Sequence, residues 1–160
     1  MTAIRRPKPD DVDAIKRLAI AAKMFDEESV GFFDDILAGF FDGTAQGHAW
    51  LVVPGFDGEL LAGAYYAPEP FADRMWNLYF LAVDPKAQGQ GLGQRLIEHV
   101  ETTLRGHGED VARTLIVETS STDQYADTRA FYARRGFVEE ARIRQYYGPE
   151  DDKVVFWKQL

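Results

Sequence analysis

Residues 83–95 read V-D-P-K-A-Q-G-Q-G-L-G-Q-R, and this stretch decides the fold. The apolar residues 78–83 lead into Asp84-Pro85, which ends a strand because proline has no backbone N–H for the ladder. Three glycines then alternate between residues 89 and 93, before a helical pattern begins. Glycine tolerates the positive φ of a tight loop, and the unpaired N–H groups that open a helix attract anions. The stretch therefore predicts a binding site for a phosphorylated cofactor.

The spacing of the glycines narrows the choice of cofactor. A P-loop is excluded, because its second glycine must be followed by lysine and none follows here. A dinucleotide fingerprint needs G-x-G-x-x-G, and the third glycine after Gly89-x-Gly91 comes one residue early. Glu118, near the end of the next expected strand, is placed where a ribose-binding acid would be. A dinucleotide-binding oxidoreductase therefore remains an alternative.

A third pattern fits the same glycines. Gln88-x-x-Gly91-x-Gly93 matches [R/Q]-x-x-G-x-[G/A], the acetyl-CoA signature of the GNAT N-acetyltransferases, and the chain resembles that family. The match follows a strand that ends L-A-V-D-P and precedes an amphipathic G-Q-R-L-I-E-H-V helix. The resemblance implies acetyl-CoA as cosubstrate. It also implies an α/β fold of the acyl-CoA N-acyltransferase type, with a single mixed, mostly antiparallel sheet and helices on both faces.

A second motif extends the resemblance towards the C-terminus. Residues 124–137 contain Phe131-Tyr132 and Gly136-Phe137, which are similar to the family's F-Y-x-x-x-G-F helix. The family often has Asn seven residues before that tyrosine, where it contacts the pantetheine arm. Tyr125 stands here instead, so this contact is not carried over. The similarity covers roughly residues 3–159 and is tightest over 78–137.

The resemblance also implies roles for individual residues around the cosubstrate. Backbone N–H groups at a splayed or bulged strand end should stabilise the thioester oxygen, and main-chain donors of the glycine loop should bind the pyrophosphate. The predicted cofactor-binding residues are Leu81, Ala82, Val83, Gln88, Gly89, Gln90, Gly91, Leu92, Gly93 and Gln94.

Two side chains are predicted to be catalytic. Tyr132 matches the tyrosine that, in many members of the family, lies beside the CoA sulfur as general acid; the alternative is that it only packs its helix. Glu118 ends the strand Leu115–Val117 and aligns with the catalytic glutamate of enzymes resembling the ribosomal-protein alanine acetyltransferases. A base is needed because an ammonium has no lone pair. The alternatives are that Glu118 is a solvated charge and that water removes the proton.

Composition bounds the remaining function classes. The 160 residues predict one domain over 1–160, and the absence of cysteine excludes disulfides, thiolate metal sites and a cysteine nucleophile. The three histidines have no metal-ligand spacing, so no metal is expected. A net charge of −8 argues against a nucleic-acid partner. It mildly favours cationic substrates, and solubility explains the same charge equally well. No apolar run is long enough to cross a bilayer, and the N-terminus lacks a signal peptide, which predicts a cytoplasmic enzyme.

Periodicity and turn residues predict the order of the secondary structure elements. Strands are expected over residues 3–6, 49–53, 60–67, 74–83, 113–118, 137–143 and 153–158. Helices are expected over residues 11–22, about 30–43, 92–105 and 126–135. The strand over 113–118 should run parallel to its predecessor, because a helix crosses between them.

These observations predict an N-acetyltransferase that moves an acetyl group from acetyl-CoA to a primary amine. Because the chain has no cysteine, and because of the family's habit, attack should be direct within a ternary complex. The alternative is a non-catalytic CoA-binding sensing module. The acceptor, a small molecule or a peptide, has no recognisable motif, and the acidic residues 26–28 either meet its ammonium or form a solvated face. A homodimer is possible, since dimers are common in the family.

Overall fold

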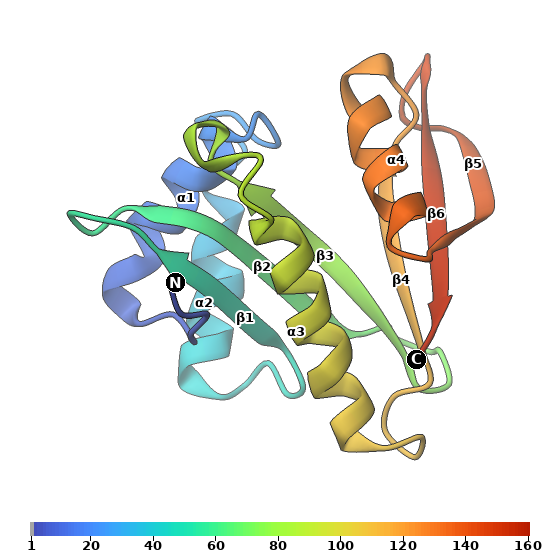
Figure 1. The fold of residues 1–160 in the computed structure, drawn as a ribbon, viewed down its shortest axis with the longest axis horizontal. Coiled ribbons are helices and arrows are strands. Elements are labelled where there is room, and N and C mark those ends of the chain that lie inside the picture. Colours follow the sequence, from blue (N-terminus) through green and yellow to red (C-terminus); the bar gives the residue numbers. More distant parts are fainter. Residues whose placement is uncertain (1) are drawn as a thin grey trace. The chain divides into compact units, whose positions relative to one another are not determined.

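The computed structural model describes residues 2–160, which form the helices and strands of an α/β fold (Figure 1). The described chain divides into two compact units. Unit 1 consists of the chain through Ala67 together with Phe80–Val100, and unit 2 consists of Pro68–Tyr79 and Glu101–Leu160. Two strands and one helix contribute residues to both units, and the prediction of a single domain over 1–160 stays a prediction.

Six strands form one mixed sheet in the order β1-β2-β3-β4-β6-β5. The strands are β1 (Ala49–Pro54), β2 (Leu60–Pro68), β3 (Met75–Val83), β4 (Thr114–Ser120), β5 (Val138–Gly148) and β6 (Asp151–Gln159). The pairs β1–β2, β4–β6 and β5–β6 are antiparallel, and β3–β4 is parallel. The predicted fold class and the predicted parallel pair are confirmed.

Four α-helices connect and cover the strands: α1 (Val12–Ala21), α2 (Phe32–Asp42), α3 (Leu92–His107) and α4 (Ala126–Arg134). Their bounds agree closely with the periodicity of the sequence. The apolar stripe of α3, which begins directly after the glycine loop, is buried at Leu96, Val100 and Leu104. The helix α2 ends at Gly43, whose φ of 81° makes the left-handed C-cap that favours glycine.

Aromatic side chains fill the core of unit 1, where α1 and α2 pack on one face of β1 and β2 (Figure 1). The Phe33 ring of α2 meets the rings of Trp50 and Phe80 edge-on, with centroids 5.7 and 5.3 Å apart. The Trp50 ring also stacks on Tyr65 at 4.6 Å. Because Trp50 and Phe33 are almost fully buried, these contacts fix α2 on the sheet.

In unit 2, α4 and the second half of α3 pack on one face of β6. Phe156 contributes a ring contact with Tyr132 of α4. Two residues further on, Lys158 forms an ion pair with the buried Glu101 of α3, at 2.5 Å, and donates a hydrogen bond to the Arg135 carbonyl. Strand residues two apart share a face, so both contacts lie on the same side of β6.

The prediction of a strand over residues 3–6 is wrong. Only one isolated bridge forms there, between Arg5 and Val52. Pro7 and Pro9 follow at once and cannot donate to a ladder. The Arg5 guanidinium instead pairs with Asp11 at 2.7 Å, and Asp11 also accepts the Lys8 amide at the start of α1. The last two strands are longer than predicted, because the hairpin pairs residues up to Gly148 and Asp151.

Removing Lys158 should destabilise the protein, because the buried Glu101 carboxylate would keep only its longer ion pair with the half-exposed Arg105, at 3.6 Å. We expect Lys158→Ala to lower the free energy of unfolding by about 3 kcal/mol, the lower end of the range for a broken buried pair. The lower end applies because a fifth of the Lys158 side chain is exposed. Urea denaturation measures the effect.

The matched control is Lys16→Ala, which breaks the more exposed pair with Asp34 and should cost less than about 1 kcal/mol. The double variant Glu101→Gln/Lys158→Met should recover much of the loss, since no buried charge remains. Equal effects of the two single lysine variants would contradict the burial argument.

Candidate functional site

Local hydrogen bonds fix the first residues of the loop between β3 and α3. The Asp84 carboxylate accepts the Lys86 amide at 2.8 Å, and the Asp84 carbonyl accepts the Ala87 amide at 2.8 Å, which makes a short 3-10 turn over Pro85–Ala87. The Asp84 amide donates to Leu61 of β2. The entry to the glycine segment is therefore fixed on unit 1.

The glycine segment itself has the backbone shape that an anion-binding loop needs. Gly89 and Gly91 have φ values of 79° and 75°, which a residue with a Cβ rarely adopts. A Cβ built at either residue would meet no atom within 4 Å, so the space above both glycines is open. On either side of the glycine segment, the backbone amides of Ala87 and Arg95 donate hydrogen bonds to nearby carbonyls. Within the described residues 2–160, the amides of 88–94 donate no such loop hydrogen bond. This geometry fits a pyrophosphate.

The three predicted oxyanion residues lie at the end of β3, just before this loop. The β3–β4 ladder joins Met75–Leu78 with Thr114–Val117, and β3 continues beyond it to Val83. Leu81 and Val83 are half-buried and Ala82 is buried. Their role in binding the thioester stays a prediction.

Tyr132 lies on α4 inside a set of aromatic rings. Its ring makes edge contacts with Phe137 at 5.6 Å and with Phe131 at 5.4 Å, and a tilted contact with Phe156 at 5.9 Å. The residue is buried, and this burial raises the pKa of the Tyr132 phenol well above its usual range. Desolvation penalises the charged phenolate, so the side chain stays protonated.

Glu118 lies on β4 and is held at both of its oxygens. Oε2 pairs with the Lys153 ammonium at 2.7 Å, and Oε1 accepts a hydrogen bond from Asn77 Nδ2 at 3.1 Å. Lys153 also stands 3.6 Å from the centre of the Tyr146 ring. Burial alone would lower the pKa of Lys153, but its interactions with Glu118 and Tyr146 outweigh burial and raise it. The carboxylate is thus oriented by a buried cation.

The register of β4 with β6 places the two predicted catalytic side chains on opposite faces of the sheet. Glu118 lies opposite Val155, and the preceding Val117 lies opposite Phe156. Successive strand residues point to opposite faces, whereas directly paired residues share a face. Because the Tyr132 ring packs on Phe156, it lies on the face of Val117. Glu118 therefore lies on the face away from Tyr132.

Sequence reasoning missed the polar residues around Glu118. Asn77 Nδ2 donates to Glu69 Oε2 at 2.9 Å as well as to Glu118, and the Tyr79 hydroxyl donates to the same Glu69 oxygen at 2.8 Å. The available signal was an asparagine inside an apolar strand, flanked by Trp76 and Leu78. A buried amide needs hydrogen-bonding partners, and that need points to a polar site.

The segment between β4 and α4 is fixed by Arg129, whose Nη1 donates to the carbonyls of Ser120 and Thr122 at 2.8 Å each. Ser120 in turn donates to the Asp151 carboxylate. Tyr125, which replaces the family's asparagine, directly precedes α4, and burial raises its pKa. A protonated phenol therefore stands where the family usually has an amide.

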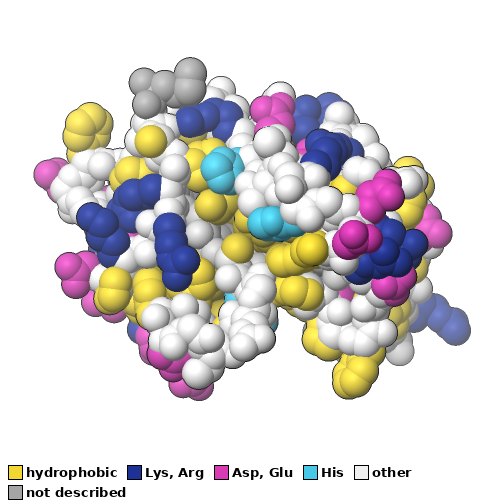
Figure 2. All heavy atoms as spheres, turned by 90° about the horizontal axis from the view of Figure 1, so that it is seen from below, with side chains coloured by type: hydrophobic (Ala, Val, Ile, Leu, Met, Phe, Trp, Pro, Cys, Tyr) yellow, Lys and Arg dark blue, Asp and Glu magenta, His cyan; other side chains and the backbone are white. Residues whose placement is uncertain are grey.

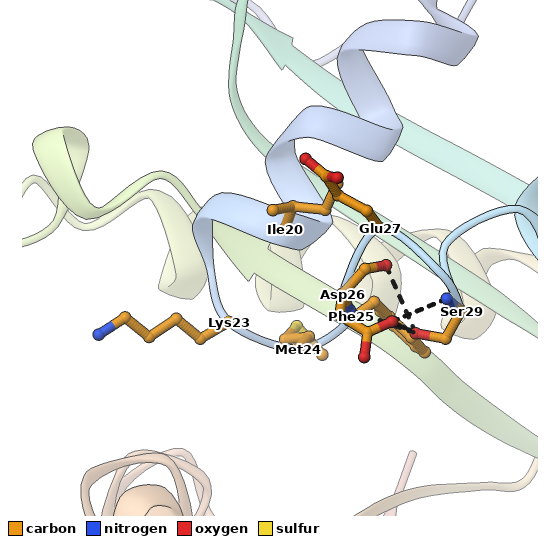
Figure 3. A pocket seen from close by; sticks show the side chains of 7 residues that line it. All are labelled: Ile20, Lys23, Met24, Phe25, Asp26, Glu27 and Ser29. Carbon is orange, nitrogen blue, oxygen red and sulfur yellow. Dashed lines mark hydrogen bonds between the residues drawn. The ribbon is translucent and has the colours of Figure 1, made fainter.

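A pocket of about 540 Å³ lies where α1 gives way to the segment before α2, as Figure 3 shows. It is lined by Ile20, Lys23, Met24, Phe25, Asp26, Glu27 and Ser29. The Asp26 carboxylate accepts the Ser29 amide and hydroxyl at 2.8 Å each, and these bonds lower the pKa of Asp26. The Asp26 carboxylate is therefore engaged in this local turn, and it is not wholly available to bind the acceptor's ammonium.

A metal site, a membrane span or a strongly charged face would indicate a different chemistry. No cluster of three or more histidine and acidic side chains within residues 2–160 could hold a metal. No helix over the same residues combines the length and apolar character that a bilayer span requires. On the face that Figure 2 displays, basic and acidic side chains are interspersed.

Comparison with known proteins gives a family. The model of the Acetyltransferase (GNAT) family matches residues 13–137. A 5-NmdU N-acetyltransferase from Pseudomonas phage PaMx11 is 30% identical over 138 residues, which cover 86% of this chain and 88% of that protein. Two other relatives match over shorter stretches. A mycothiol acetyltransferase from Beutenbergia cavernae is 37% identical over 97 residues, and the Escherichia coli ribosomal protein bS18-alanine N-acetyltransferase is 40% identical over 76.

The matches cover 61% and 48% of this chain, but only 30% of the mycothiol enzyme and 47% of the ribosomal-protein enzyme. Among solved structures, a GNAT-family acetyltransferase from Desulfovibrio desulfuricans covers 99% of both chains, with 30% identity and a TM-score of 0.89. The predicted family resemblance, including its ribosomal-protein alanine acetyltransferase-like relatives, is confirmed. The individual site residues stay predictions.

Replacing Gly91 should weaken cofactor binding more than it weakens folding. Gly91→Ala forces a Cβ onto a residue with φ of 75° and into the open space above the loop. We expect the dissociation constant for CoA to rise at least about tenfold, since the strain of roughly 1–2 kcal/mol either distorts the loop or opposes the bound state. Isothermal titration calorimetry measures this.

Gly58→Ala is the matched control. Gly58 has a φ of 78° and an equally open surround, but it lies in the β1–β2 turn. The two variants should lose similar stability, and only Gly91→Ala should lose CoA affinity. Unchanged CoA binding by Gly91→Ala would remove the loop from the cofactor site.

Proposed function

Because the chain belongs to the Acetyltransferase (GNAT) family, we propose that it transfers the acetyl group of acetyl-CoA to a primary amine. The glycine loop carries this proposal, since its open space and its amides without loop hydrogen bonds fit a pyrophosphate. The full-length match to an acetyltransferase fold supports the same activity. A sequence without cysteine supports direct attack within a ternary complex over an acyl-cysteine route.

Main-chain amides of residues 88–94 would hold the pyrophosphate, and those of residues 81–83 would face the thioester oxygen. Acetyl-CoA supplies the activated acetyl group as a thioester. Preorganised amide donors stabilise developing negative charge without having to reorganise, which is the largest contribution in many acyl transfers. Metal-independent activity and a cytoplasmic location are part of the proposal.

In this proposal Tyr132 stabilises the departing thiolate. Its raised pKa keeps the phenol protonated, as a donor must be. A thiol has a pKa of about 8.5, below that of the Tyr132 phenol, so complete proton transfer from the phenol to the thiolate is unfavourable. Tyr132 therefore acts mainly as a hydrogen-bond donor to sulfur, in an aromatic surround where such a bond is strengthened.

Glu118 is proposed as the group that accepts the amine's proton, directly or through water. Lys153 and Asn77 each engage one of its oxygens, and each oxygen keeps a second lone-pair direction. About a quarter of the side chain is exposed, so an acceptor can reach it. Because Glu118 lies on the face of the sheet away from Tyr132, the two groups would have to approach the same acetyl carbon from opposite sides of β4.

The first test combines binding and turnover. The protein should bind CoA in calorimetry and release free thiol from acetyl-CoA when a panel of primary amines and peptides is added. Glu118→Gln and Tyr132→Phe should each lower kcat by about 10²–10⁴-fold, with CoA affinity almost unchanged. Binding without transfer to any amine would favour the CoA-sensing alternative, and no binding would end the proposal.

The second test is the pH dependence of kcat/KM. The amine reacts only when deprotonated, so the rate should rise with pH from 7 towards 9.5. Because the pKa of Tyr132 is raised above its usual value near 10, its protonated form persists over that whole range. The profile should therefore show no alkaline decline below about pH 10. A decline that is present in the wild type and absent in Tyr132→Phe would contradict the raised pKa.

A further inference from the structure

We propose that Glu69 binds a second cationic nitrogen of the acceptor, so that the preferred acceptors are short diamines or amines with a nearby cationic group. This inference rests on the proposed function and names its substrate class. It assigns to Glu69 a specificity role in addition to the roles of Glu118 and Tyr132.

The Asn77 side-chain amide on β3 holds the carboxylates of Glu69 and Glu118 close together. Asn77 Nδ2 donates to Glu69 Oε2 at 2.9 Å and to Glu118 Oε1 at 3.1 Å. Two oxygens bonded to the same nitrogen can be no farther than about 6 Å apart. The carboxylates are thus close enough to meet two nitrogens of one small molecule.

Within the described chain, the two carboxylates of Glu69 and Glu118 have only one cation between them. Lys153 pairs with Glu118, whereas no cation within residues 2–160 pairs with Glu69, which receives only neutral donors from Asn77 and Tyr79. Two like charges at this separation repel, and partial burial strengthens the repulsion. A ligand cation beside Glu69 would neutralise the remaining charge.

Asn77 supplies an independent reason to regard the group as a ligand site. The residue is 1% exposed, and its Oδ1 is buried without a hydrogen-bond partner. An unsatisfied buried acceptor is destabilising, so an apolar residue at this strand position would suit folding better. Such groups persist where they serve function, and here the other end of the amide fixes two carboxylates.

Both carboxylates can be reached from outside, since Glu69 and Glu118 are each half-buried while Asn77 beneath them is closed off. The reacting nitrogen belongs at Glu118, the proposed proton acceptor. The second nitrogen then belongs at Glu69. In an extended 1,3-diaminopropane the nitrogens are roughly 5 Å apart by standard bond lengths, which lies within the limit of about 6 Å on the separation of the two oxygens.

The experiment compares 1,3-diaminopropane with propylamine as acceptors for the wild type, Glu69→Gln and Glu109→Gln. Glu109 is an exposed glutamate in the same unit, so its variant controls for the loss of one negative charge. Glu69→Gln should lower kcat/KM for the diamine at least about tenfold, mainly through KM, as loss of one charge partner does. The value for propylamine, the KM for acetyl-CoA and both Glu109→Gln values should stay within about twofold.

Equal losses for both acceptors would make Glu69 a structural residue and overturn the inference, and so would no loss for either. Acetylation of no amine by the wild type would instead end the proposed function. A readout without turnover separates these cases: NMR titration of the CoA-loaded protein should show 1,3-diaminopropane binding that Glu69→Gln weakens and Glu109→Gln does not. Equal binding by all three proteins would also overturn the inference.

Discussion

The strict two-residue alternation of β4 is the constraint on which the site depends. Val117 and Glu118 are adjacent in the chain, and the ladder with β6 sends them to opposite faces of the sheet. The Val117 face receives Phe156 and, through it, Tyr132. A register shift of one residue would exchange the faces, placing a carboxylate among aromatic rings and an apolar side chain beside Lys153. Strand pairing therefore places the buried Tyr132 phenol and the partly exposed Glu118 carboxylate on opposite faces of the sheet.

The neighbouring strand β6 has one lysine on each face of the sheet. Lys153 pairs with Glu118 on one face, and Lys158 pairs with Glu101 on the other. Both pairs are largely removed from water, where one partner without the other is costly. The two pairs nevertheless differ in what surrounds them. Glu101 is enclosed by α3 and β6, whereas Glu118 keeps part of its surface exposed, so only the second pair is open to a substrate.

The parts of the fold that sequence could predict are those set by local chemistry. Positive φ at Gly89 and Gly91 follows from residue type, and the apolar stripe of α3 follows from helical period. The short strand near Arg5 was predicted wrongly because its apparent β pattern competes with two prolines and an ion pair to Asp11. The polar network was missed because Asn77 and Glu118 are 41 positions apart, and neither residue alone indicates the other.

The surroundings of Tyr132 and Glu118 differ in the charge that they can accommodate. Aromatic rings around Tyr132 provide no stabilisation for a phenolate, and its pKa rises accordingly. Glu118 instead faces a cation and an amide donor, both of which stabilise a carboxylate. Since β4 alternation places Val117 and Glu118 on opposite faces, the difference between the two surroundings follows from the sheet itself.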